Sequence, residues 1–385
     1  MTKACYVGVA GKARKVKKIY TGVDNKARKV KKAYVGVGGK ARPFFSAESK
    51  LSYYGTVTRL DDGRAYFPAT TVGNYGLFGG GYSGRILDTV DAYSTSLVHS
   101  TPTKLSEVRY DLAATTVGDY GLFGGGHTTD GVTELDIFSP TVDAYSASLV
   151  RSTPTELSER RAVLAATTVG NYGLFGGGYL ILKNTTYLSF AIVDAYSATL
   201  VRSTPTALSQ KKYGLAATTV GDFGLFGGGN DNTHEVSAVV DAYSATLVRS
   251  TPTALSYARN NLAATSVGGY ALFGGGNGFD TVDAYSASLV RSTPTALSEE
   301  RYNLAATSVG DYGLFGGGGL LRGTMFSSTV DAYSAALVRS TPTGLIYPRG
   351  GLAATTVGNY GLFGGGTNQN DYYITVDAYT VDGGG

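Results

Sequence analysis

Short segments rich in β-branched and aromatic residues alternate with turn residues along most of the chain. In the unit that begins at residue 109, LAATTV and YGLFG flank a Gly-Asp pair, and TVDAYS and LVRSTP flank an Ala-Ser pair. Gly-Asp and Gly-Asn pairs can adopt positive φ and suit two-residue hairpin turns. No window shows the sustained 3.6-residue apolar period of a helix. The pattern therefore predicts an all-β fold with four short strands, a to d, in each unit.

The units repeat seven times in register. The motif VDAY begins at residues 90, 142, 193, 240, 282, 330 and 376, and GGG begins at residues 79, 124, 176, 227, 274, 316 and 364. From each VDAY to the next GGG the distance is always 34 residues, so this part of the unit tolerates no insertion. The connection from each GGG to the following VDAY instead contains 8, 15, 14, 10, 5, 11 and 9 residues. Length varies only between strands b and c.

Seven units of four strands predict a closed seven-bladed β-propeller. The motif resembles the kelch repeat, in which a basic residue precedes the inner strand, a hydrophobic strand ends in glycines and the next strand carries a tyrosine. The resemblance covers residues 51–385. Its basic residues are Arg64, Arg109, Arg161, Lys212, Arg259, Arg301 and Arg349, and its tyrosines are Tyr93, Tyr145, Tyr196, Tyr243, Tyr285, Tyr333 and Tyr379.

The ends of the repeat region predict how the ring closes. The last unit stops after strand c, and the segment at 51–60 precedes the first unit. When Arg64 is aligned with Arg109, Leu60 falls on Leu105, in the region of a strand d. We therefore expect the N-terminal segment to complete the seventh blade. Prolines in the other outer strands would blunt exposed edges, because proline cannot donate to a strand ladder.

The glycine triplets could in principle form phosphate-binding loops. Such loops open a helix whose N-terminus helps to hold the anion. Here each triplet leads into a loop and then a strand, so we interpret it as structural.

The variable b–c loops should gather on one face of the propeller, because the a–b and c–d turns lie at the other end of the strands. Different residues on a copied scaffold are typical of a recognition surface, although simple sequence drift is an alternative. Apolar loop residues expected to be exposed include Leu180 and Met325. The candidate binding residues are Tyr82, Arg85, His127, Tyr179, Tyr187, Phe190, His234, Phe279, Arg322, Phe326, Tyr372 and Tyr373.

Catalytic and metal chemistry are weakly indicated. His99, His127 and His234 fall in an outer strand and two different loops, without the spacing of a metal site or a catalytic triad. The aspartate of each VDAY, such as Asp91, is expected to be a structural partner of backbone N–H groups or of the repeated basic residue. Acids near residues 130–136 and 230–232 could bind calcium, but they lack an EF-hand pattern. We expect no enzyme activity, no cofactor and no metal.

Charge divides the chain near residue 44. Residues 1–43 contain thirteen Lys or Arg and one acid, a net charge of +12. Because the whole chain has a net charge of +4, the remaining residues carry about −8. A 14-residue repeat occupies this part, YVGVAGKARKVKKI, YTGVDNKARKVKKA and YVGVGGKAR, and its glycines predict strands and turns instead of a helix. We therefore divide the chain into a basic β-repeat arm at 1–44 and a propeller at 45–385.

The arm is expected to dock on other proteins or to form oligomers, since one short repeat cannot bury a face alone. Nucleic-acid binding is the less favoured alternative, although tyrosines interleave with the charges. The docking residues are Lys12, Arg14, Lys15, Lys17, Lys18, Lys26, Arg28, Lys29, Lys31, Lys32, Tyr6, Tyr20 and Tyr34.

The sequence of the arm also bears on the kind of assembly to which the protein belongs. KARKVKKAYVGVGGKAR resembles the basic repeats at the front of structural and tail proteins of phages and prophages of Gram-positive bacteria. This implies a virion protein, made in the host cytoplasm, whose arm binds other virion proteins and whose b–c face binds a host-surface glycan or protein. A propeller adaptor inside or on a cell is the main alternative, and a propeller enzyme the next. With one cysteine and no 18-residue apolar run, we expect neither intrachain disulfides nor membrane insertion.

Overall fold

A computed structural model describes the fold. Residues 50–128, 137–182, 186–320 and 325–381 are described in full, and residue 382 and six strands between residues 6 and 46 by their backbone. The chain forms two compact units, Tyr53–Thr380 and a second that combines Met1–Ser52 with Val381–Gly385. All regular elements in the described part are strands, and no described helix is long and apolar enough to cross a membrane.

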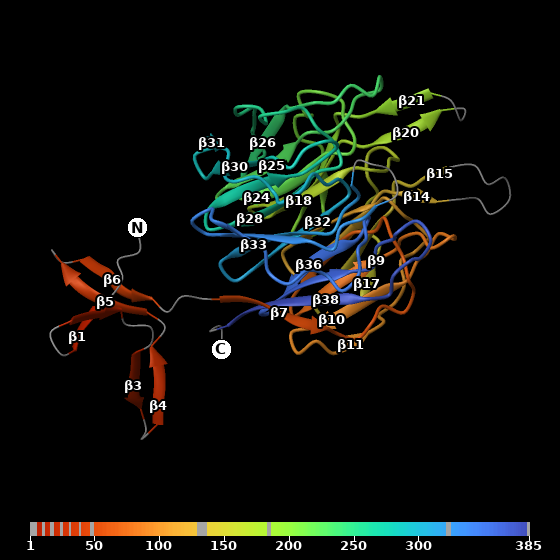
Figure 1. Cartoon of the computed structure of the whole chain (residues 1–385). Helices are drawn as coiled ribbons and strands as arrows, with labels where there is room; N and C mark the ends of the chain where they lie inside the picture. The colour runs from red at the N-terminus through yellow and green to blue at the C-terminus, as the bar shows by residue number, and fades with distance from the viewer. Residues whose placement is uncertain are drawn as a thin grey trace. The chain divides into compact units, whose positions relative to one another are not determined.

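The larger unit is a β-propeller of seven four-stranded blades (Figure 1). The all-β fold class is therefore confirmed. The first four blades are blade 1, β8 (Ala69–Val72), β9 (Tyr75–Gly79), β10 (Val90–Ser94) and β11 (His99–Ser100); blade 2, β12 (Ala113–Val117), β13 (Tyr120–Gly124), β16 (Val142–Ser146) and β17 (Arg151–Ser152); blade 3, β18 (Ala165–Val169), β19 (Tyr172–Gly176), β22 (Val193–Ser197) and β23 (Arg202–Ser203); and blade 4, β24 (Ala216–Val220), β25 (Phe223–Gly227), β26 (Val240–Ser244) and β27 (Arg249–Ser250).

The remaining blades follow the same order. They are blade 5, β28 (Ala263–Val267), β29 (Tyr270–Gly274), β30 (Val282–Ser286) and β31 (Arg291–Ser292); blade 6, β32 (Ala305–Val309), β33 (Tyr312–Gly316), β34 (Val330–Ser334) and β35 (Arg339–Ser340); and blade 7, β36 (Ala353–Val357), β37 (Tyr360–Gly364), β38 (Val376–Asp382) and β7 (Lys50–Thr56). Two b–c loops add hairpins, β14 (His127–Thr128) with β15 (Ile137–Phe138) and β20 (Tyr179–Leu182) with β21 (Thr186–Ser189), and Figure 1 shows both on the right of the propeller.

The predicted closure of the ring is confirmed. Strand β7 is the outermost strand of blade 7, beside β38. The chain then runs toward blade 1, and the Val57 and Leu60 N–H groups donate to the carbonyls of Val376 and Ile374 at 2.9 and 2.8 Å. Joining both ends of the repeat region in one sheet removes a free edge from the ring.

The hydrophobic core lies between neighbouring blades. Val117 and Leu122 of blade 2, for example, belong to one buried cluster with Phe175 and Tyr196 of blade 3. The Tyr196 hydroxyl donates to the Thr155 carbonyl at 2.7 Å, in the segment that leads out of blade 2. Each repeated tyrosine makes the same bond, so it buries an apolar ring and satisfies its polar end.

The glycine triplet has a packing role, as predicted. A Cβ added to Gly124 would lie 2.8 Å from the Phe175 ring of the next blade. The following Gly125 has φ of +73°, a conformation that L-residues rarely adopt. The triplet therefore lets two blades approach closely and lets the chain leave the sheet.

The repeated basic residues and aspartates form buried pairs. Arg161 and Asp194 lie 2.7 Å apart in blade 3, and Lys212 and Asp241 lie 3.1 Å apart in blade 4, all with fully buried side chains. The other five blades repeat the contact between arginine and aspartate. These aspartates are structural partners of the basic residues, as the sequence predicted.

The outer strands are shorter than predicted. The segment LVRSTP contributes only two residues to the ladder, such as Arg151–Ser152 in β17. Leu149, just before it, has φ of +62° and closes the c–d turn, where its N–H donates to the Ser146 carbonyl at 2.8 Å. The proline that follows cannot donate, so the ladder ends there.

In the described part of the arm, six strands pair two by two in antiparallel fashion, in agreement with the predicted strands. The pairs are β1 (Tyr6–Val9) with β2 (Lys12–Lys15), β3 (Ile19–Val23) with β4 (Lys26–Val30), and β5 (Lys32–Val37) with β6 (Lys40–Ser46).

Candidate functional site

One residue from each blade forms a ring at the mouth of the central channel, on the face of the b–c loops. Each lies just before an inner strand and has φ between 50° and 63°. The Asp111 N–H donates to the Tyr66 carbonyl at 2.8 Å, and the Tyr66 N–H donates to the Gly351 carbonyl at 2.8 Å, which closes the circle. The complete ring is Tyr66, Asp111, Val163, Gly214, Asn261, Asn303 and Gly351, joined by bonds of 2.8–3.0 Å.

The ring surrounds a cavity of about 210 Å³. A second layer of apolar side chains lines it from below, with Phe67 in blade 1 and leucines such as Leu112 in the other blades. The cavity therefore combines a polar rim with an apolar wall, which is a common composition for small-ligand sites.

Asp111 is the one acid among the described residues that line this cavity. Burial raises the pKa of its carboxyl to about 7, far above the ordinary value for aspartate. Its Oδ2 atom lies 3.9 Å from Nε2 of His127, whose side chain is buried. The mouth of the channel thus holds a carboxyl group that gains and loses its proton near neutral pH.

Aromatic side chains continue from this point around the same face. The ring of Tyr110 stacks on His127 with centroids 4.8 Å apart, and Tyr179 lies 5.7 Å from His127 and 4.8 Å from Tyr213. We call the tyrosine and histidine rings that contact one another in this way the aromatic arc. It comprises Tyr372, Tyr82, Tyr110, His127, Tyr179, Tyr187, Tyr213 and His234, with neighbouring centroids 4.8–6.3 Å apart.

The arc spans the loops of blades 7, 1, 2, 3 and 4 and is partly open to solvent. Tyr187 and His234 are exposed, whereas most of the other rings are half-buried. The Tyr213 hydroxyl is 2.6 Å from Nδ1 of His234, so the arc also carries ordered polar groups. Such a surface offers flat apolar faces beside hydrogen-bonding groups.

The structure brings together six of the twelve candidate binding residues. The arc contains Tyr82, His127, Tyr179, Tyr187, His234 and Tyr372.

Three of the other candidates make contacts outside the arc. Phe279 stacks on Tyr257, Tyr373 stacks on Tyr347, and Arg85 forms an exposed pair with Asp62. Phe326 is half-buried, and Arg322 lies outside the described residues.

Most of the loop residues expected to be exposed are half-buried or buried, and only Tyr187 and Met325 among them are exposed. Leu180 is buried and Phe190 is half-buried, because both belong to a small cluster with Phe138 and Ala162 beneath the loops of blades 2 and 3. Met325, in contrast, is exposed.

Sequence reasoning missed Tyr110, Tyr213 and Asp111. They lie in the links that join strand d of one blade to strand a of the next. These links are part of the 34-residue segment of constant length. The residue after each repeated basic residue nevertheless varies from blade to blade, as alanine, tyrosine, asparagine or glycine. This variation in residue type, within a segment of constant length, could have indicated that these positions belong to the binding face.

The docking residues of the arm remain a prediction. Ten of them, including Tyr6, Tyr20 and Tyr34, lie in the hairpin strands, whose backbone alone is described. Lys17, Lys18 and Lys31 lie outside the described residues, as do the acids at 130, 134 and 136. Asp231, from the second predicted calcium cluster, accepts hydrogen bonds from Thr233 and Glu235 within its own loop.

Comparisons with known proteins support the fold. No protein-family profile matches the chain, and no curated protein sequence matches it. The chain is similar to the solved structure of YjhT, a propeller protein, with a TM-score of 0.56 and 11% sequence identity over 71% of this chain and 97% of that one. At this identity the likeness establishes the β-propeller architecture alone.

Proposed function

We propose that this protein is a non-catalytic binding propeller that recognises a surface glycan through the aromatic arc. The propeller fold is consistent with a binding or adaptor role. The observation that carries the proposal is the continuity of the arc across five sets of loops that otherwise share neither length nor sequence. Partly exposed aromatic residues gathered in this way mark interaction surfaces.

A glycan fits the chemistry of the arc better than a flat protein surface does. A pyranose ring presents C–H faces edged by hydroxyl groups, and tyrosine presents an apolar face with a polar end. Partners such as the Tyr213–His234 pair supply hydrogen-bonding groups between the rings. An arc that crosses several blades also suits an extended chain of sugars better than a single one.

The experiment is a comparison on an array of bacterial surface polysaccharides. We expect the wild-type protein to bind a defined subset, and the double variant Tyr82→Ala/Tyr187→Ala to lose at least about tenfold in affinity, equivalent to about 1.4 kcal/mol. Tyr257→Ala is the matched control, because Tyr257 is exposed and stacks on Phe279 outside the arc. Equal losses in the control and in the arc variant would contradict the proposal.

The basic arm would hold the propeller on a phage or phage-like particle. Two-stranded hairpins are seldom stable by themselves, and the charge contrast with the propeller supports a separate role in docking. Deleting residues 1–44 should leave a folded propeller that no longer incorporates into particles. Normal incorporation of the truncated chain, measured by mass spectrometry of purified particles, would refute the docking role and favour the adaptor alternative.

A further inference from the structure

The buried aspartate of strand c has the same neighbours in most blades. In blade 2, Asp143 contacts Arg109 from the preceding link and Arg151 from strand d, the latter at 2.9 Å. It also accepts a hydrogen bond from the Ser106 N–H at 3.1 Å. Blades 3, 5 and 6 repeat this arrangement of two arginines and one serine around each aspartate.

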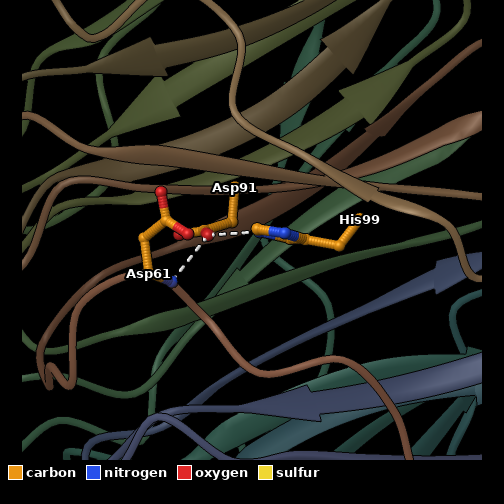
Figure 2. A group of neighbouring side chains, drawn as sticks. All are labelled: Asp61, Asp91 and His99. Carbon is orange, nitrogen blue, oxygen red and sulfur yellow. Dashed lines mark hydrogen bonds and ion pairs between the residues drawn. The ribbon is translucent and has the colours of Figure 1, made fainter.

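Blade 1 departs from this arrangement at two positions. His99 stands in strand d where blades 2 to 6 have arginine, and its Nε2 lies 2.6 Å from Oδ1 of Asp91. Asp61 stands where they have serine, and its N–H donates to the same Oδ1 at 3.0 Å. Figure 2 shows the three side chains converging, with Asp61 and His99 on either side of Asp91.

The two replacements change the local charge in the same direction. Replacing an arginine with a histidine removes a permanently charged group and supplies an imidazole nitrogen that can bind a metal ion. Replacing a serine with an aspartate adds a carboxylate. Both replacements therefore favour a cation at this point in blade 1 over the same point in blade 2.

The donor atoms are also close enough to share one ion. One ligand atom from each of Asp61, Asp91 and His99 lies within 4.8 Å of the others. Asp91 is fully buried, His99 is 13% exposed and Asp61 is exposed, so solvent reaches one side of the cluster. Arg64 contacts the second oxygen of Asp91 at 2.6 Å and leaves Oδ1 facing His99 and Asp61. A charged partner of this kind fixes the orientation of a ligating carboxylate.

We propose that Asp61, Asp91 and His99 form a binding site for a divalent transition-metal ion of the zinc class. Two carboxylates and one imidazole suit zinc, and a water molecule on the exposed side would supply the fourth ligand of a tetrahedral site. Ligand atoms around tetrahedral zinc are about 3.3 Å apart. His99 and Asp91 therefore have to separate by less than about 1 Å. Ligation through Nε2 requires a neutral imidazole with its proton on Nδ1, so zinc takes the place of any proton between Nε2 and Oδ1 of Asp91.

The position of the site gives it a structural consequence. Leu60, next to Asp61, bonds to Ile374 of blade 7, whereas Asp91 and His99 belong to blade 1. A bound ion would fasten the segment that closes the ring to the first blade. Since the ion binds the folded chain, it should raise the temperature of unfolding.

The test uses the full chain, free of affinity tags and treated with chelator, and titrates it separately with Zn²⁺, Mn²⁺ and Ca²⁺. We expect one equivalent of Zn²⁺ to bind and the unfolding temperature to rise. The variant Asp61→Ser/His99→Arg restores the arrangement of blades 2, 3, 5 and 6, and should lose that equivalent. Ser106→Asp/Arg151→His recreates the blade 1 arrangement in blade 2, and should bind a second equivalent.

Asp61→Asn provides a milder variant if the double replacement impairs folding. It changes one exposed side chain and should weaken zinc binding by at least about tenfold. The proposal is overturned if the wild-type chain binds no stoichiometric zinc, if Asp61→Asn binds it as well as the wild type does, or if calcium is preferred over zinc, because imidazole would then take no part.

Discussion

The interior of each blade repeats the same residues in every unit, whereas the b–c loop face differs from one unit to the next. In the interior, a basic residue, an aspartate, a tyrosine and a glycine triplet return seven times with the same spacing and the same contacts. On the loop face, neither lengths nor residues repeat, yet side chains from five blades meet in one aromatic arc. The difference indicates that the repeats maintain the ring and that the loops carry the specificity.

The buried ion pairs should give the largest effect on stability. In Arg161→Ala, Asp194 loses a partner 2.7 Å away in a fully buried site, and the free energy of unfolding should fall by about 3–5 kcal/mol. Urea unfolding monitored by circular dichroism measures the change. Arg161→Lys is the control, since blade 4 uses Lys212 at this position and should show that a milder change is tolerated. If both variants lose the same stability, the charge pair is not the cause.

Contacts between blades should give the next largest effect. In Gly124→Ala, the new Cβ meets the Phe175 ring at 2.8 Å, and the strain should cost about 1–3 kcal/mol in the same unfolding experiment. Gly121→Ala is a matched control, because Ala271 occupies the equivalent position in blade 5. A loss in the control as large as in Gly124→Ala would show that close approach of the blades is not the reason.

Protonation at the channel mouth should give a smaller, pH-dependent effect. The folded-state pKa of Asp111, about 7, lies above its ordinary value near 4, so its contribution to stability is largest at acid pH and is lost as the pH rises through 7. Asp111→Asn removes this loss, and Asn261 and Asn303 already adopt the same backbone conformation in blades 5 and 6.

The advantage of Asp111→Asn over the wild type should therefore be greater at pH 8 than at pH 5. We expect a difference of about 1 kcal/mol, because the side chain keeps 27% exposure and solvent relieves part of the cost of its charge. Urea unfolding of both proteins at the two pH values measures this. An advantage that is the same at both values would show that Asp111 does not titrate in this range.

Much of the propeller could be predicted from the sequence because seven copies reveal their own register. The alignment of Leu60 with Leu105 located the closing strand, and the glycine pairs located the turns. The short outer strands escaped prediction because leucine at positive φ, as at Leu149, leaves no sign in strand propensity. The arc was found only in part, since the contact of Tyr110 with His127 depends on two segments that meet through a single bridge.

We conclude that residues of the b–c loop face bind the ligand and that the repeated residues inside the blades stabilise the fold. The most direct test compares the two faces, using Tyr82→Ala/Tyr187→Ala on the arc and Val150→Ser/Val248→Ser in the exposed c–d turns at the opposite ends of the strands. Affinity for the polysaccharide selected on the array should fall at least about tenfold in the arc variant alone, with both variants as stable as the wild type to within about 1 kcal/mol. Loss of binding in the valine variant, with the arc variant unchanged, would contradict the account.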